Sequence, residues 1–192
     1  MWWVELLNSF VSVLDSGGAG GGGGAYESIA TATGTGSSGT ITFSSIPSTY
    51  VSLQIRLIAN DGGNNNIGIR FNSDSTTSYA NHRLEGDGST ASASANTSVN
   101  RALYIGQALG TGLANTFGVA IIDIHDYQSS TKNTTVRSFN GWDTNNSADG
   151  GVVRLSSGLW INTAAVTSVS LVDLGGSFST SSVFSLYGIK GA

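Results

Sequence analysis

Two residues of this chain, Asp123 and His125, come nearest to catalytic chemistry by their types and spacing. They lie two positions apart in a segment with the pattern of a strand, so their side chains share a face and could form a hydrogen bond. Such a pair activates a serine hydroxyl in hydrolases. Serines are abundant in this sequence, but none lies in a nucleophile-elbow motif. We therefore expect a polar network at a strand end, no catalytic residue, and a chain that is not an enzyme.

A glycine-rich segment, residues 34–39, matches the dinucleotide-binding pattern G-x-G-x-x-G. That motif needs a helix directly after it, because the N-terminus of the helix holds the pyrophosphate. Here the segment 40–43 follows, Thr-Ile-Thr-Phe, whose β-branched residues predict a strand. The glycines then fit a hairpin turn between two strands. We expect no nucleotide and no other cofactor.

Metal chemistry has few candidate ligands. The chain contains no cysteine, and its two histidines, His82 and His125, lie far apart in the sequence. We therefore expect no tightly bound structural metal. Calcium is the alternative, because Asp61, the asparagines at 64–66 and Asp74 could supply oxygen ligands. These residues lack the regular spacing of a known calcium-binding loop.

Two tryptophans of this chain could stack on sugar rings. Trp160 lies in the apolar segment 159–161 and is predicted to be part of the core. Trp142, in the more polar segment 140–143, is the better candidate for a ligand-binding residue on the surface. A carbohydrate-binding module is therefore one alternative function.

The elements that must position these residues are strands. Residues 51–57 alternate between apolar and polar types, as expected of a half-buried strand. Residues 117–124 are nearly continuous in apolar types, as expected of a central strand that is covered on both faces. About ten such segments follow one another from residue 26 onward, and none has a sustained helical period. This pattern predicts an all-β fold, an antiparallel β-sandwich, with a jelly roll as the best single choice.

Specific strands and core residues follow from the alternation. The expected strands are residues 26–33, 40–43, 51–57, 67–71, 79–85, 99–105, 117–124, 134–139, 152–155, 166–171 and 183–189, with a loop at 87–96. The residues expected inside are Leu53, Ile55, Ile69, Phe71, Val119 and Ile121. Four arginines fall in the polar phase of their strands, where they could pair with acids of a neighbouring strand or subunit: Arg56, Arg70, Arg137 and Arg154.

Composition excludes several classes of partner. Only 10% of the 192 residues are charged, and the formal net charge is −4. The eight lysines and arginines are scattered, so we expect neither nucleic acid nor an anionic membrane surface as a partner. No apolar stretch reaches the roughly 18 residues that a membrane-spanning helix needs. The apolar content of 39% is enough for one folded domain of ordinary size.

The glycine tract 17–24 divides the chain into three predicted parts. Residues 1–16 form an anchor peptide, residues 17–24 a flexible hinge, and residues 25–192 the sandwich domain. In the anchor peptide, apolar residues recur at helical spacing and acids lie between them, which predicts one apolar docking face. An extended peptide, or a helix that folds back on its own domain, is the alternative. The predicted docking residues are Trp2, Trp3, Leu6, Leu7, Phe10, Val13 and Leu14.

Several segments of the sandwich domain are distinctive as a set. They are Tyr26-Glu-Ser-Ile29, residues 42–50 leading into Leu53-Gln-Ile-Arg56, Ile69-Arg-Phe-Asn72, Asp123-Ile-His-Asp-Tyr127, Thr135-Val-Arg-Ser138, residues 157–165 and Leu186-Tyr-Gly-Ile-Lys190. With these segments, residues 26–190 resemble a family of small β-sandwich virion proteins of tailed bacteriophages.

This resemblance implies a structural protein on the surface of the virion. The expected role is capsid decoration (cement) or a head fibre, docked through the anchor peptide on the major capsid protein or on tail or fibre proteins. It also implies a homo-oligomer, with a trimer favoured from the habits of such proteins. The alternative is a tail-fibre or receptor-binding component whose sandwich binds carbohydrate. The resemblance brings no catalytic residues to this chain.

Overall fold

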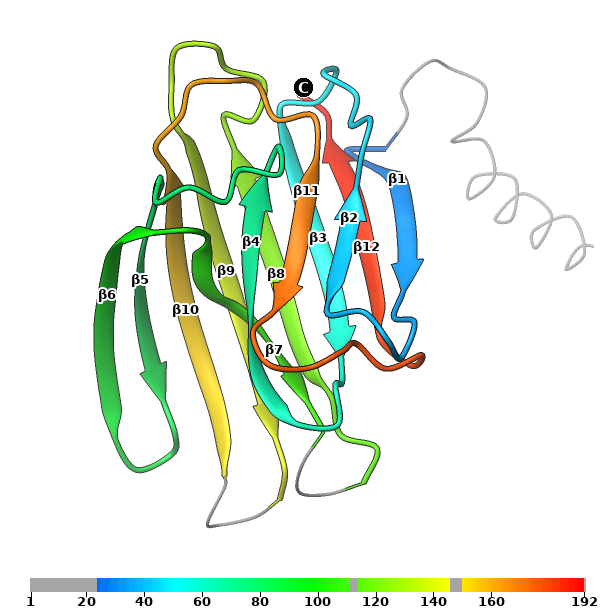
Figure 1. The fold of residues 1–192 in the computed structure, drawn as a ribbon, viewed down its shortest axis with the longest axis vertical. Helices are drawn as coiled ribbons and strands as arrows, with labels where there is room; N and C mark the ends of the chain where they lie inside the picture. Colours follow the sequence, from blue (N-terminus) through cyan, green and yellow to red (C-terminus); the bar gives the residue numbers. More distant parts are fainter. Residues whose placement is uncertain (1–23, 111–113, 146–149, 192) are drawn as a thin grey trace, which may run out of the picture.

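The computed structural model describes residues 24–110, 114–145 and 150–191. This part of the chain contains twelve strands and no helix, and therefore no helix that could cross a membrane (Figure 1). The strands are β1 (Tyr26–Thr33), β2 (Thr40–Phe43), β3 (Ser52–Ala59), β4 (Asn64–Phe71), β5 (Tyr79–Gly86), β6 (Ala91–Val99), β7 (Ala102–Leu109), β8 (Gly118–His125), β9 (Thr134–Asp143), β10 (Gly151–Trp160), β11 (Val169–Asp173) and β12 (Val183–Ile189).

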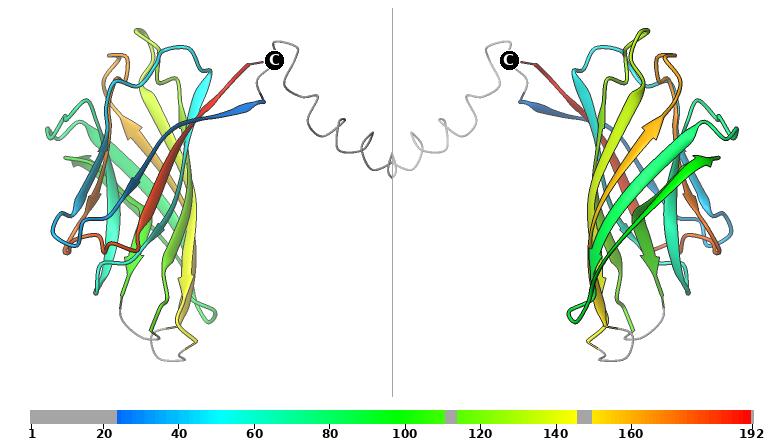
Figure 2. Two further views of the ribbon diagram at one scale, coloured as in Figure 1. Left: turned by 90° about the vertical axis from the view of Figure 1, so that its right-hand side faces the viewer. Right: turned by 90° about the vertical axis from the view of Figure 1, so that its left-hand side faces the viewer.

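The strands form two antiparallel sheets that face each other. One sheet has eight strands in the order β1-β12-β3-β8-β9-β10-β5-β6, and the other has four in the order β2-β11-β4-β7. In Figure 1 the smaller sheet lies over the larger one, and the β5–β6 hairpin projects beside it; Figure 2 shows the two layers from the side. The all-β prediction and its two antiparallel layers are confirmed.

The core lies between the sheets and is built from one phase of each strand. Leu53, Ile55, Ile69 and Phe71 are fully buried, as predicted from the alternation. The largest group in the core is an aromatic cluster at one end, in which Trp160 packs against Phe71 and Tyr79 with ring centroids 5.6 and 6.4 Å away.

The prediction for β8 was wrong in its phase. Val119 and Ile121 are about half exposed on the outer surface of the larger sheet, and Ala120, Ile122 and Ile124 face the core instead. Both phases of this strand are apolar, so the alternation could not decide which one faces inward. A strand that is apolar on both sides is normally covered on both sides, but no described part of the chain covers the outer side of β8.

Residues 87–96, which the sequence predicts as a loop, are mostly strand. The segment turns at Asp87, whose carboxylate accepts hydrogen bonds from the backbone N–H groups of Ser89 and Thr90, and then runs as β6 along β5. Strand β6 lies at the edge of the sheet and buries little, so its alanines and serines show no apolar alternation. The next strand, β7, consequently begins three residues later than expected.

The glycine segment 34–39 leads into a strand, as predicted, but it does not form a hairpin turn. Strands β1 and β2 belong to different sheets, and the segment carries the chain from one sheet to the other. A side-chain carbon added to Gly34 would lie 2.0 Å from the backbone oxygen of Ser179, so only glycine allows this approach. Gly36 follows with a φ of +74°, in the left-handed region that also favours glycine.

Candidate functional site: the outer face of the larger sheet

The usual arrangement of polar and apolar residues is reversed along β9 and β10. Within these strands, several polar side chains point between the sheets and several large apolar side chains point outward. The buried polar residues are Ser138, Asn140, Arg154 and Ser156, and the exposed apolar residues are Phe139, Val153 and Leu155. A sheet with solvent on its outer side normally has the opposite pattern, so this face resembles an interior surface.

The reversal extends to the neighbouring strands and produces one continuous surface, which we call the apolar sheet face. It consists of seven large side chains from β3, β8, β9, β10 and β5, each 43–59% exposed. They are Ile58, Leu84, Val119, Ile121, Phe139, Val153 and Leu155.

Strand register makes this surface continuous. Ile121 pairs with Phe139, Phe139 with Leu155, and Leu155 with Leu84, so these four residues form one row across four strands. Residues directly opposite each other on adjacent strands point to the same face and lie within contact distance. Ile58 and Val119 are paired in the adjacent row.

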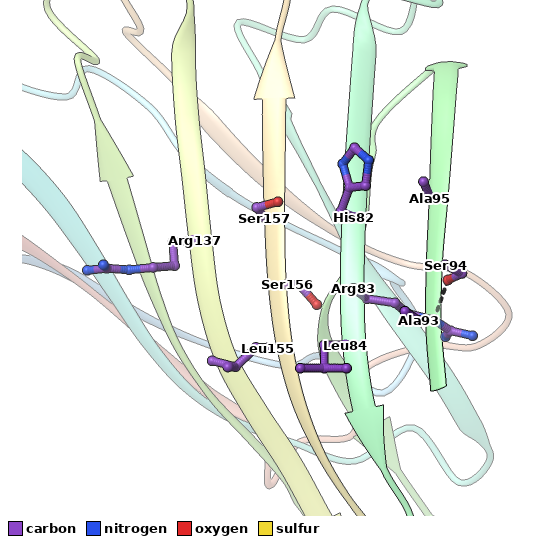
Figure 3. A pocket seen from close by; sticks show the side chains of 10 residues that line it. All are labelled: His82, Arg83, Leu84, Ala93, Ser94, Ala95, Arg137, Leu155, Ser156 and Ser157. Atoms are coloured by element: carbon purple, nitrogen blue, oxygen red, sulfur yellow. Dashed lines mark hydrogen bonds between the residues drawn. The ribbon is translucent and has the colours of Figure 1, made fainter. Parts of the chain in front are cut away.

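The apolar sheet face carries two shallow depressions of about 620 and 640 Å³. The first lies over β5, β6 and β10, and its lining includes Leu84, Leu155 and His82. Figure 3 shows Leu84 and Leu155 side by side on β5 and β10, with Ser157 also on β10 and Arg137 to one side on β9. The second depression extends from Ile58 past Phe139. Both depressions are lined by mostly apolar groups, which suits a complementary protein surface better than a polar substrate.

Charged groups at the edge of this face are paired. Asp123 accepts hydrogen bonds from Gln54 Nε2 at 2.9 Å and from Arg137 at 3.0 Å. Partial burial opposes ionisation of Asp123, but these two hydrogen bonds outweigh it and lower the pKa of the carboxyl group. Asp123 and His125 share the outward phase of β8, as predicted, yet no hydrogen bond joins them. The pair therefore lacks the geometry of a base and the group that orients it.

Arg154 is the central charge of the polar interior. Sequence analysis placed it in the polar phase of its strand, where it could pair with an acid of a neighbouring strand. It does pair with Glu85 of β5, at 2.8 Å, but it is only 4% exposed, and its guanidinium also donates to Asn66 at 3.0 Å. It also stacks over the rings of Tyr104 and Trp142, with distances of 5.4 and 5.3 Å to the ring centroids. These contacts keep a charge between the sheets that burial alone would make costly.

A bulge in β7 provides the acceptor for the other polar residues in this region. The pairing of β4 with β7 shifts between Ile67 and Ile69, opposite Tyr104, whose φ is +62°. The carbonyl oxygen of Tyr104 accepts hydrogen bonds from Ser156 Oγ at 2.7 Å and from Asn140 Nδ2 at 3.2 Å. Polar side chains can therefore occupy the inward phase of β9 and β10, and apolar ones the outward phase.

Trp142, the predicted surface residue for ligand binding, is only partly exposed. It shares the inward phase of β9 with Asn140, and Arg154 stacks on its ring. The residue is part of the lining of the second depression and of a smaller hollow near Gly88. The predicted docking residues all belong to the anchor peptide and lie outside the described residues.

We predict that Arg154→Lys lowers the free energy of unfolding by about 1.5–3 kcal/mol. Lysine keeps the charge but loses the planar fork that contacts Glu85 and Asn66 together. Urea unfolding followed by tryptophan fluorescence measures the change. Arg137→Lys is the matched control, because its ion pair with Asp123 is exposed and is worth about 0–1 kcal/mol. Equal losses in the two variants would contradict a structural role for the Arg154 contacts.

Sequence reasoning missed the apolar sheet face. The apolar residues in both phases of 117–124 were the one signal, and they led to the prediction of a strand that the rest of the chain covers on both faces. Comparison with protein-family models, with curated proteins and with solved structures finds no match for this chain.

Proposed function

We propose that this chain is a non-enzymatic structural protein of a bacteriophage particle, a capsid decoration or head-fibre subunit that associates with copies of itself. The observation that carries the proposal is the apolar sheet face. Contiguous exposed apolar patches of more than a few hundred Å² are rare on monomeric proteins and mark interaction sites. Seven large side chains on five adjacent strands form such a patch. The proposal that the assembly is a phage particle rests on the sequence resemblance to phage virion proteins.

Copies of this chain are the occupants that suit the apolar sheet face best. Each copy carries a carboxylate and a guanidinium at the edge of the face, Asp123 and Arg137, and these pair with each other, so this edge adds no net charge that would repel a second copy. Ser157 and small residues of β6 help to line the first depression, which gives an edge of another copy a place to pack. A closed ring of copies covers every such face, and a trimer is the state we favour.

We also infer a jelly-roll relationship for the sandwich. Strands β5–β6 and β9–β10 add hairpins to one side of the larger sheet. Without them, the orders β1-β12-β3-β8 and β2-β11-β4-β7 remain, and the chain passes between the sheets at most connections. This is the pattern of two Greek keys that jelly rolls of viral shells and lectins share. It supports a role in assembly, although the fold alone assigns no function.

The anchor peptide supplies attachment in this proposal. All twelve strands begin after it, and the core between the sheets uses residues from Ile29 onward. In this proposal its predicted apolar face binds the major capsid protein or a tail or fibre protein. The carbohydrate-binding alternative depends on Trp142, but the Arg154 guanidinium already lies over its ring, 5.3 Å from the centroid, which leaves less of the ring for a sugar. For that reason we favour capsid decoration over receptor binding as the function of this chain.

We predict that Val153→Asp converts the oligomer into a monomer. The substitution puts a charge into the apolar sheet face, and burying an unpaired carboxylate costs several kcal/mol, which corresponds to a loss of affinity of about 100-fold or more. Native mass spectrometry and light scattering after size exclusion measure the state of the protein. Val51→Asp is the matched control, because Val51 is equally exposed, at 65% against 59%, but lies outside the face.

Two results would overturn the proposal. A wild-type protein that stays monomeric at concentrations of about 100 μM has no self-association of the strength that assembly requires. Oligomers that survive Val153→Asp use another surface. Mixing labelled protein with purified phage particles and sedimenting them tests the particle itself, and failure to co-sediment would remove the virion role while leaving the oligomer in place.

A further inference from the structure

Two carboxylates from distant parts of the chain meet at one end of the sandwich. Asp61 lies between β3 and β4, and Asp173 ends β11. Both reach Gly176: its N–H donates to Asp173 Oδ1 at 3.0 Å, and a side-chain carbon added to it would lie 2.8 Å from Asp61 Oδ2. The carboxylate of Asp61 is close enough to act electrostatically on that of Asp173. Two such neighbouring negative charges repel each other unless a proton or a cation lies between them.

Asp173 has an oxygen atom without a partner. The residue is 7% exposed, and its Oδ1 accepts hydrogen bonds from the N–H groups of Gly175 and Gly176, each at 3.0 Å. Its Oδ2 is buried and has no hydrogen-bond partner. Burial, together with the neighbouring charge of Asp61, raises the pKa of Asp173. Buried carboxylate oxygens without a donor are uncommon in folded proteins, and a proton, a water molecule or a cation satisfies them.

Asn65 adds an amide group to the same place. Its Nδ2 donates to Asp61 Oδ2 at 2.7 Å, and its Oδ1 faces Gly175 so closely that a side-chain carbon there would lie 2.3 Å from it. The backbone N–H of Gly63 holds the other oxygen of Asp61 at 2.8 Å. Glycines at 63, 175 and 176 leave the space around these oxygens free of side chains.

We propose that Asp61, Asp173 and Asn65 form a calcium-binding site that joins the β3–β4 connection to the β11–β12 connection. Calcium accepts six to eight oxygen ligands in irregular geometry, so two carboxylates, an amide oxygen and water or backbone oxygens can satisfy it. The absence of nitrogen and sulfur ligands makes zinc a poor fit, and magnesium requires more regular octahedral geometry. Bound calcium supplies Asp173 Oδ2 with a partner and cancels the repulsion from Asp61.

This site replaces the set of calcium ligands that the sequence offered. Asp74 lies elsewhere and bonds to Thr76 and to Trp160 Nε1. The side-chain oxygens of Asn64 and Asn66 accept hydrogen bonds from Gln107 and Arg154. Only Asp61 and Asn65 remain from that set, and Asp173 joins them from a strand that lies more than a hundred positions away.

Thermal unfolding of the full chain at pH 7.5 tests the site with calcium chloride alone as the probe. Calcium at about a hundredfold excess over its dissociation constant is expected to raise the unfolding midpoint by about 5 °C or more. Isothermal titration should give one calcium per chain with a dissociation constant of about 10⁻⁵–10⁻³ M. Magnesium at the same concentration should have a much smaller effect.

Asp173→Asn is the decisive variant. It removes one negative charge, so the protein should melt at an equal or higher temperature without calcium and lose the calcium-dependent shift. The control is Asp87→Asn, an exposed loop aspartate with similar backbone contacts, which should keep the full shift.

An absence of any calcium shift, or an equal shift in Asp173→Asn, would overturn the site. So would stabilisation by acid with no response to calcium, because Asp61 and Asp173 then share a proton. None of these results depends on the oligomeric state, so they leave the assembly proposal to its own test.

Discussion

Replacing Trp160 by alanine is expected to lower the free energy of unfolding by about 3–5 kcal/mol. The side chain is 1% exposed, and it fills the aromatic cluster between Phe71 and Tyr79. Alanine leaves a cavity that the neighbouring strands cannot close, and it leaves Asp74 Oδ2 without the indole N–H that donates to it at 2.7 Å. Urea unfolding at constant oligomeric state, followed by far-ultraviolet circular dichroism, measures the loss.

Trp160→Phe separates the two contributions. Phenylalanine keeps most of the apolar volume but cannot donate to Asp74, so we expect a smaller loss of about 1–3 kcal/mol. Should both variants lose the same amount, the hydrogen bond and not the packing would dominate this end of the core. An unchanged free energy of unfolding in Trp160→Ala would contradict the packing described above.

Deleting residues 1–16 is expected to abolish attachment to phage particles while leaving the sandwich folded and soluble. Every strand of both sheets lies after the deleted segment, so the unfolding midpoint should change little. The apolar face that the sequence predicts is too large to remain in water, and burying its side chains on a partner contributes on the order of 10 kcal/mol before ordering costs. Co-sedimentation with particles and thermal unfolding measure the two effects.

Point substitutions test the same model within the full chain. Replacing Leu6, Leu7 and Phe10 by aspartate should also abolish attachment, because it puts unpaired charge into the docking face. The matched control adds three aspartates at Asn8, Ser9 and Ser12, on the polar side of the predicted helix, and should bind normally. Removing two or three glycines from 17–24 should reduce attachment far less than the aspartate substitutions, since the reach of a flexible linker changes slowly with its length.

Two outcomes would contradict the anchor model. If the truncated chain aggregates or melts much earlier, the peptide belongs to the folded core. If it folds and still binds particles, attachment uses the sandwich itself, and the loops or the apolar sheet face become the contact.

The pattern of apolar residues determined the class of fold in advance. Alternation in β3 and β4 placed Leu53, Ile55, Ile69 and Phe71 inside, and all four are buried there. This succeeds because a strand with one apolar and one polar phase has only one arrangement that removes its apolar side chains from water. The bounds of β1, β2 and β12 were also predicted to the residue.

Strands β8, β9 and β10 have no such unique solution, and there the tertiary structure decided. Apolar and polar side chains fit both phases, and the choice depends on what lies opposite. The carbonyl oxygen of Tyr104, in the bulge of β7, accepts hydrogen bonds from Asn140 and Ser156 between the sheets. Arg154 has Glu85 and Asn66 as partners in the same region. Their apolar neighbours must then face outward, because adjacent residues of a strand point to opposite sides.

The tertiary structure also decided which carboxylates lie together, Asp61 and Asp173, although they are far apart in the sequence. The sequence by itself showed oxygen-bearing residues around Asp61, but hydrogen bonding between β4 and β11 brings Asp173 into reach of Asp61. Ligands that come from separate strands meet only through the register of the sheet, which is set by many residues together. Local propensity therefore determined most strands of this protein, whereas packing between the sheets decided which face remained apolar, and strand pairing within the smaller sheet decided which charges meet.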